Sequence, residues 1–189
     1  MTTSTKKNSK RTMLILATVF IVPVLVAKLA LEFNWFNNAA TNQGELISPA
    51  LDLRALKSSS DEPKWQLLYL LPSDCQASCE NAIYSIGQIR SALGRESDRV
   101  EALVIATKLS DKQQLASLKD QSSIRIFTAE QQALNKVFQG TPTEGIFIVD
   151  TLSNVILRYA PQSDQQQAVL HSRDILLDMK KLLKLSRIG

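Results

Sequence analysis

The sequence predicts an α/β fold, in which helices flank a mixed sheet, with one transmembrane helix ahead of it. Apolar runs of strand length alternate with segments whose apolar residues recur every three or four positions, which is typical of strands alternating with amphipathic helices. Two short runs near the end read as a hairpin, and a long uncharged run stands near the start. Because helical crossovers join parallel strands and hairpins join antiparallel ones, we expect the sheet to be mixed.

The amino terminus predicts a membrane anchor. Four basic residues (Lys6, Lys7, Lys10 and Arg11) precede residues 13–27, an uncharged apolar run. The stem of Lys28 can reach toward the headgroups, so we expect an anchor over 12–33, near the roughly 20 residues that a bilayer needs. The positive-inside rule makes 1–11 cytoplasmic and the domain external. The alternative is a cleaved signal peptide, whose apolar core is usually shorter, roughly 7 to 15 residues.

Charge and composition give the remaining division of the chain. The net charge of +4 equals the four basic residues before Thr12, and beyond them Lys and Arg balance Asp and Glu. The excess is therefore a topology signal for a lipid bilayer, with no reason to expect nucleic acid as a partner. Trp35 and Phe36 are expected interfacial anchors, 34–45 a polar tether, and 46–189 one domain.

The first half of this domain contains four expected elements. Residues 46–56 predict a peripheral strand or hairpin, since Pro49 disfavours a central position. Residues 65–71 form an apolar, aromatic-containing run between two prolines and predict a buried strand. The stripe that follows predicts a helix ending at Gly94, and 100–106 predict a second buried strand.

The second half continues the alternation. We expect a weak helix over 110–116 with Ser110 as its N-cap, and a short strand over 124–127. Thr128 is the expected N-cap of a helix over 129–138. The apolar runs then predict paired strands at 145–149 and 155–159 and a final amphipathic helix at 166–185.

The two cysteines of the chain, Cys75 and Cys79, stand where the first buried strand gives way to its helix. Open α/β sheets usually carry their sites at this carboxyl end, and a helix N-terminus stabilises a thiolate, so Cys75 is the candidate nucleophile. If both residues are helical, they share one face and can close a disulfide or bind a soft metal ion such as Cu(I). The alternative is two buried, inert side chains.

These features resemble the Sco/SenC family, membrane-anchored thioredoxin-fold proteins that deliver copper to cytochrome c oxidase or reduce its copper-site cysteines. The resemblance covers most of the chain from about residue 44 onward. It rests on the anchor, Tyr69, Pro72, the Cys-x-x-x-Cys spacing of Cys75 and Cys79, and the run 146–150 that ends in Asp150. The resemblance implies a thioredoxin-like fold.

Two positions depart from the family pattern. Glu80 stands where these proteins usually have proline, and Pro142 stands where they have the histidine that is their third copper ligand. The one histidine, His171, lies elsewhere, and we expect it to be exposed or hydrogen-bonded rather than a ligand. Thioredoxin-fold oxidoreductases place a cis-proline in this region, so Thr141–Pro142 is a candidate cis bond lining a substrate groove. The alternative is that Pro142 simply opens the next strand.

The resemblance implies a role in oxidase assembly at a bacterial inner membrane, with a periplasmic domain. In the first hypothesis Cys75 attacks and Cys79 resolves a mixed disulfide with a respiratory oxidase subunit or other copper-delivery protein, and no cofactor is required. In the second, the same cysteines bind Cu(I) for delivery. In the third, they form a static disulfide in a scaffold. The sequence has no phosphate-binding glycine loop and no Ser/His/Asp set, and leaves open whether the chain is an enzyme.

Overall fold

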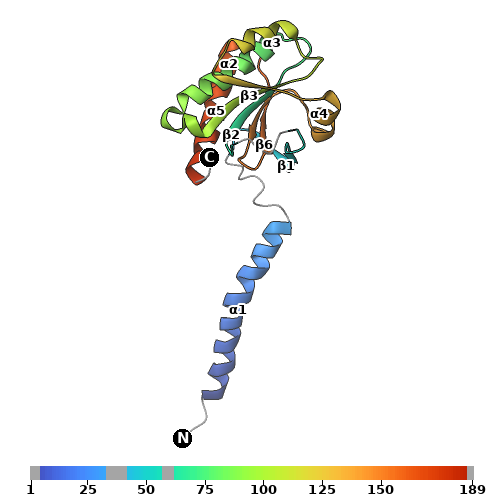
Figure 1. Ribbon diagram of the computed structural model, residues 1–189. Helices are drawn as coiled ribbons and strands as arrows, with labels where there is room; N and C mark the ends of the chain where they lie inside the picture. Colours follow the sequence, from blue (N-terminus) through green and yellow to red (C-terminus); the bar gives the residue numbers. More distant parts are fainter. Residues whose placement is uncertain (1–4, 33–41, 57–61, 187–189) are drawn as a thin grey trace. The chain divides into compact units, whose positions relative to one another are not determined.

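The computed structural model describes residues 5–32, 42–56 and 62–186, and the chain divides into two units, Met1–Thr41 and Asn42–Gly189. In the first unit, α1 (Thr5–Glu32) is one helix with Pro23 inside it (Figure 1). Its segment Lys10–Ala30 has a mean hydropathy of 2.5 and is the one part of the described chain long and apolar enough to cross a membrane. Trp35, Phe36 and most of the expected tether lie outside the described residues.

The second unit is built on a six-stranded mixed sheet with the order β1-β6-β5-β2-β3-β4. Strands β2, β3 and β4 are parallel, and β5, β6 and β1 continue the sheet antiparallel to their neighbours, as the sequence predicts. The strands are β1 (Glu45–Asp52), β2 (Trp65–Leu70), β3 (Val100–Ala106), β4 (Ile124–Thr128), β5 (Ile146–Val149) and β6 (Asn154–Tyr159).

Helices cover both faces of this sheet. Helices α2, α3 and α5 contribute to the core on one face, and α4 contributes to the core on the other (Figure 1). Their bounds are α2 (Ala77–Ala92), α3 (Lys112–Lys119), α4 (Gln131–Val137) and α5 (Gln165–Leu185), and a 3-10 helix, η1 (Gly94–Arg99), follows α2. Every residue of β2 is buried, because β2 lies in the middle of the sheet and is covered from both sides.

Alternation along β2 divides the interior into two cores. Leu67 faces α2 and α5, where Ile86 and Met179 are fully buried. Leu68 faces the opposite core, which includes Phe147 of β5 and Phe138 after α4, whose rings meet edge to face at 5.3 Å. The central strand is therefore fixed by packing on both sides, and the loop after it starts from a rigid base.

The structure corrects two expected N-caps. Asp111 caps α3, accepting a hydrogen bond from the Gln114 N–H at 3.0 Å, and Ser110 instead lies buried in the preceding turn. Thr128 ends β4, and Glu130 occupies the N-cap position of α4 without a side-chain cap bond. Ser110 and Thr128 are both residues that often cap helices, but each is held in the element that precedes the helix and not at the N-cap position.

Of the two proline predictions, one is confirmed and one is wrong. Pro49 lies in β1, an edge strand, as expected. The Thr141–Pro142 bond is trans, so the candidate cis bond is wrong, and the described residues have their cis bond at Ser48–Pro49. Thr141 belongs to the turn that ends α4, where its N–H donates to the carbonyl of Phe138 at 3.0 Å, and a trans bond is the ordinary preference of X–Pro.

A buried carboxylate joins the start of the second unit to its last helix. Asp178 of α5 is fully buried and accepts hydrogen bonds from the Tyr159 hydroxyl at 2.8 Å and from the N–H groups of Gln43 at 2.6 Å and Gly44 at 3.2 Å. Lys181 Nζ lies 3.1 Å from Asp178 Oδ1. Burial alone raises the pKa of Asp178, but these bonds outweigh it and lower the pKa below its ordinary value, so the group stays charged.

Candidate functional site

The two cysteines form a disulfide at the end of β2. Cys75 and Cys79 have Cα atoms 5.2 Å apart and are bonded through sulfur. Helix α2 begins at Ala77 with Gln76 as its N-cap, so Cys75 precedes the helix and Cys79 lies in its first turn. The condition that both residues are helical is not met, since Gln76 between them has an extended backbone, but the pair still closes the disulfide that the spacing allows.

The two sulfur-bearing residues differ in accessibility. Cys79 is 2% exposed and belongs to the core under α2, whereas Cys75 is half-buried and packs against the edge of that core. Helices expose N–H groups and partial positive charge at their first turn, which favours a thiolate there. Cys75 is thus the residue of the pair that an incoming sulfur reaches more easily, and its assignment as nucleophile stays a prediction.

The turn after β3 holds the loop that carries Cys75. Ser110 Oγ donates to the carbonyl of Leu71 at 2.7 Å, and the Asp111 N–H donates to the carbonyl of Pro72 at 2.8 Å. Cys75 N–H in turn donates to Asp111 Oδ2 at 3.2 Å. Hydrogen bonds from the N–H groups of Gln114 and Cys75 lower the pKa of the Asp111 carboxyl. Ser110 and Asp111 were not among the site residues expected from the sequence, although a Ser-Asp pair at the carboxyl end of the neighbouring parallel strand is a signal for this role.

A cleft of about 630 Å³ opens beside the disulfide at the carboxyl ends of β2 and β3. The predicted groove residues Thr141 and Pro142 do not line it, but the next two residues, Thr143 and Glu144, do. The other lining residues come from the β2 end and disulfide loop (Tyr69, Leu70, Leu71, Pro72, Ser73, Asp74, Gln76, Ser78, Cys79), the β3 end (Ile105, Thr107, Leu109, Ser110), α4 (Gln131, Leu134, Asn135) and Pro161.

The ionisable side chains that line the cleft are acidic or neutral. Asp74 accepts a hydrogen bond from Gln76 Nε2 at 2.8 Å. Tyr69 is buried, and that burial, with the nearby charge of Glu144, raises its pKa to about 12, so the phenol is neutral at physiological pH. A buried neutral phenol, two carboxylates and a disulfide thus border one cavity.

Residues 65–186 match the family model described as transmembrane-like, thioredoxin-like, C-terminal domain. The chain belongs to this family. Its fold is thioredoxin-like, and the disulfide stands where the first core strand of that fold meets its helix. A comparison with curated proteins found no match.

Solved structures are similar to this thioredoxin-like protein at low identity. Apo Sco1 from Thermus thermophilus is 15% identical, with a TM-score of 0.53 over 75% of this chain and 97% of that one. ScoI of Arabidopsis thaliana with copper bound is 12% identical, with a TM-score of 0.49 over 73% and 98%. A putative thiol:disulfide interchange protein DsbE from Chlorobium tepidum is 12% identical, with a TM-score of 0.48 over 72% and 94%.

Among the described residues, no three His, Cys, Asp or Glu side chains gather as a potential metal site. His171 lies on α5 beside a separate small cavity with Asn81 and Pro161, and its Nδ1 is buried without a hydrogen-bond partner in the described structure. The expectation that His171 is exposed or hydrogen-bonded is therefore wrong at Nδ1, since that atom is buried where α5 lies beside α2 and the segment after β6.

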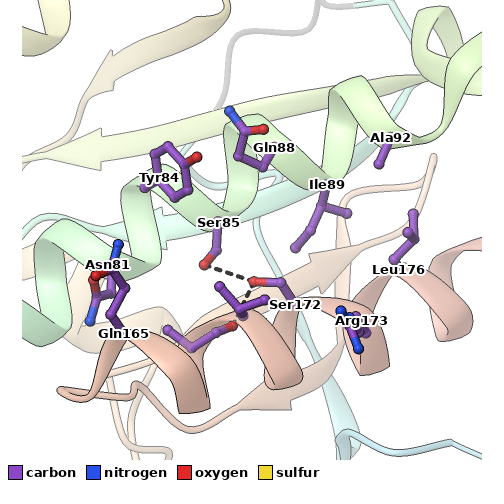
Figure 2. Close-up of a pocket in the computed structure, with 12 residues that line it drawn as sticks. Asn81, Tyr84, Ser85, Gln88, Ile89, Ala92, Gln165, Ser172, Arg173 and Leu176 are labelled. Atoms are coloured by element: carbon purple, nitrogen blue, oxygen red, sulfur yellow. Dashed lines mark hydrogen bonds between the residues drawn. The ribbon is translucent and has the colours of Figure 1, made fainter.

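A second hollow of the domain, about 270 Å³, lies between α2 and α5 and contains neither cysteine. Figure 2 shows Tyr84 and Gln88 of α2 above Arg173 and Leu176 of α5, with the Ser172 hydroxyl joining the helices by a 2.9 Å hydrogen bond to Ser85 Oγ. Its walls are mostly apolar and carry no cysteine, histidine or carboxylate. The redox-capable group of this domain is thus confined to the cleft at the strand ends.

Proposed function

We propose that this chain is a membrane-anchored protein that exchanges thiols and disulfides with protein substrates. The observation that carries the proposal is the Cys75–Cys79 disulfide beside an open cleft at the carboxyl ends of parallel strands. A structural disulfide needs no such cavity, whereas a substrate segment that brings its cysteine to the half-buried Cys75 needs a surface to bind, and the cleft lined by Gln76 and Cys79 supplies one.

The proposed reaction begins with the reduced pair and a disulfide substrate. The Cys75 thiolate attacks one substrate sulfur, so one sulfur–sulfur bond forms and the substrate disulfide breaks, releasing a substrate thiolate. The Cys79 thiolate then attacks Cys75 in the mixed disulfide, closing the observed bond and releasing the second substrate thiolate. Two electrons pass from the domain to the substrate, and the substrate takes up two protons. The reverse sequence oxidises a dithiol substrate.

Nearby groups have definite roles in this scheme. The N-terminus of α2 stabilises the negative charge on sulfur, and Cys79 lies in its first turn. Asp111 holds the Cys75 backbone and acts as a positioning residue, since its contact is with the N–H group rather than with the sulfur. Thr143 and Glu144 in the loop before β5, next to Thr141 and Pro142, line the same cleft as the disulfide loop and in this scheme contact the substrate backbone.

We further propose that the substrate is a respiratory oxidase subunit, or another copper-delivery protein, and that the process is cytochrome c oxidase assembly. The basic residues in the first part of α1, ahead of its apolar run, support a cytoplasmic amino terminus and a periplasmic domain at a bacterial inner membrane. The Cys-x-x-x-Cys spacing and the thioredoxin-like fold support the choice of process.

A second candidate is delivery of Cu(I) as cargo. Once reduced, Cys75 and Cys79 supply two soft thiolates, which suit Cu(I). The described residues bring no third cysteine, histidine or carboxylate to them, so the partner would have to donate the remaining ligand. This requirement makes thiol exchange the function that the present side chains support best.

The test uses the full chain in detergent micelles, equilibrated in redox buffers of defined potential. We expect a reversible two-electron couple with a reduction potential above about −300 mV, because structural disulfides typically have potentials below that value. In cells lacking the native gene, the wild-type chain and Ser91→Ala, a control on the far turn of α2, should restore oxidase assembly, and Cys75→Ser and Cys79→Ser should not.

Three results separate the alternatives. Restoration of assembly by Cys75→Ser would overturn the proposal. A potential well below −300 mV together with that restoration would identify a static disulfide in a scaffold. Stoichiometric Cu(I) retained by the reduced chain against a competing chelator, and lost in Cys79→Ser, would favour copper delivery instead.

A further inference from the structure

We propose that the cleft selects substrate segments in which a basic side chain lies near the reacting cysteine, with an apolar residue beside it. This inference rests on the proposed function and adds the chemical class of the substrate. It is carried by the charges and the apolar floor of the cleft, two features that the exchange reaction itself does not require.

The two carboxylates of the cleft come from separate loops at one edge of the sheet. Asp74 immediately precedes Cys75 in the loop after β2. Glu144 lies two residues before Ile146, which pairs with Tyr69 in the antiparallel β2–β5 ladder. That register brings Glu144 level with the end of β2, so both carboxylates border the space beside the disulfide.

These carboxylates keep their negative charge available. Among the residues that the structure describes, neither Asp74 nor Glu144 takes part in an ion pair. Arg158 approaches Glu144, but its Nε donates to the backbone carbonyl at 3.0 Å, and its guanidinium pairs with Glu45, also at 3.0 Å. A cationic substrate group would supply the missing counter-charge.

Lys108, which stands between two cleft residues in the chain, is already paired. Lys108 belongs to the turn after β3 that also contributes Thr107 and Leu109 to the cleft, and its Nζ lies 3.1 Å from Glu130. Both side chains of this pair are largely exposed, so the pair adds little net field. The effect of Glu144 on the Tyr69 phenol supports a field that is negative inside the cavity.

Four buried apolar side chains in the lining of the cleft are called its apolar floor here: Leu70, Leu71 and Ile105 at the strand ends and Leu134 of α4. Leu109 also lines the cleft, with 65% of its surface exposed. An exposed leucine beside an apolar floor favours burial of an apolar substrate side chain. The acidic and apolar features together define the substrate class.

The experiment measures recognition in a single exchange step. The full-length Cys79→Ser chain, reduced so that Cys75 is a free thiol, is mixed with single-cysteine peptides activated as disulfides with thionitrobenzoate. Cys75 forms the new disulfide with the peptide, and the coloured thionitrobenzoate anion leaves, so the sulfur and electron counts balance. The peptides share an apolar residue and differ only in whether lysine, glutamine or glutamate flanks the cysteine.

We expect the lysine peptide to react about tenfold faster than the glutamate peptide, because both cleft carboxylates, Asp74 and Glu144, are exposed and each contributes a modest charge contact. The ratio of these two rates, the charge preference, should fall toward one in about 1 M salt, because salt screens exposed charges. Asp74→Asn and Glu144→Gln should each reduce it. Glu80→Gln, a matched loss of charge next to Cys79 at a position that does not line the cleft, should leave it in place.

The outcomes distinguish this inference from the proposed function. If Cys75 reacts with every peptide no faster than the free amino acid cysteine reacts with the same peptide, the proposed exchange function itself is wrong. If all three peptides react well but at one rate, exchange stands and the charge selection is wrong. A preference removed by Glu80→Gln and untouched by Asp74→Asn and Glu144→Gln would also overturn the assignment to the cleft.

Discussion

The backbone N–H of Cys75 donates a 3.2 Å hydrogen bond to the carboxylate of Asp111, a residue 36 positions later in the chain. The same carboxylate caps α3 through the Gln114 N–H at 3.0 Å. One side chain therefore fixes both the start of a helix and the approach to the disulfide. The relationship links the parallel strands β2 and β3 at the edge where the proposed chemistry takes place.

Substitution of Asp111 by Asn separates these two roles. An amide oxygen still caps α3 through the Gln114 N–H, but the NH₂ group that replaces Oδ2 cannot accept from Cys75. We expect reduction of the disulfide by dithiothreitol to become several-fold faster, because the Cys75 loop loses its anchor. Asp164→Asn is the matched control, since Asp164 caps α5 through Gln167 and has no contact with the cysteines. Equal reduction rates in both variants would contradict the anchoring role.

Two glycines should respond in opposite directions to alanine. A Cβ at Gly44 would lie 2.5 Å from the ring of Tyr159, so Gly44→Ala should displace the ring and weaken the Asp178 network, lowering the free energy of unfolding by about 1–3 kcal/mol.

A Cβ at Gly87, inside α2, meets its nearest atom at 4.0 Å. Gly87→Ala should therefore raise the free energy of unfolding by up to about 1 kcal/mol through helix propensity. Urea denaturation measures both, and a destabilising Gly87→Ala would show that the helix surface is tighter than described.

Asp178 predicts a specific pH dependence of stability. Its folded pKa is lowered, so its contribution is present above the unfolded value of about 3.9 and is lost as the pH falls through the folded pKa. We expect Asp178→Asn to cost about 2 kcal/mol or more at pH 7, because charged hydrogen bonds are replaced by neutral ones. The gap between wild type and variant should close as the pH is lowered below about 4. Parallel urea curves from pH 7 to 3 measure it, and a gap independent of pH would exclude a charged Asp178.

The elements that could be predicted from sequence are those formed by local apolar patterns. The runs that became β2, β3 and β5 are continuous because both faces of the sheet are covered, and the stripe of α5 reflects one buried face. Strand and helix positions were therefore correct to within a few residues. The position of the cysteines at the strand-to-helix junction followed from the same patterns.

The parts that could not be predicted depend on contacts between distant segments. Ser110 and Asp111 are both good N-caps, and hydrogen bonds to Leu71 and Pro72 of another loop decide between them. From the sequence alone, Asp178 is predicted to be a polar residue on a surface helix. Its burial depends on hydrogen bonds from Gly44 and Tyr159, which are distant in the chain. The trans bond at Thr141–Pro142 belongs to the turn after α4, which no pattern in the nearby residues specifies.

The amino-terminal boundary of the domain provides the last prediction. The sequence pattern places it at residue 46, but Gln43 and Gly44 donate to the buried carboxylate of Asp178, so a chain that begins at Leu46 leaves that charge with fewer partners. Relative to a chain that begins at Asn42, we expect a loss of about 3 kcal/mol in the free energy of unfolding.

A double-mutant cycle isolates the cause of that loss. Starting at Leu46 also removes the exposed Glu45–Arg158 pair, which contributes at most about 1 kcal/mol. In the Asp178→Asn background the difference between the two starting points should fall by more than half, because the donors then face a neutral amide. Urea denaturation of the four chains measures the coupling. A difference that is the same in both backgrounds would place the effect in the β1 edge strand, and the boundary at residue 46 would then be adequate for the Asp178 network.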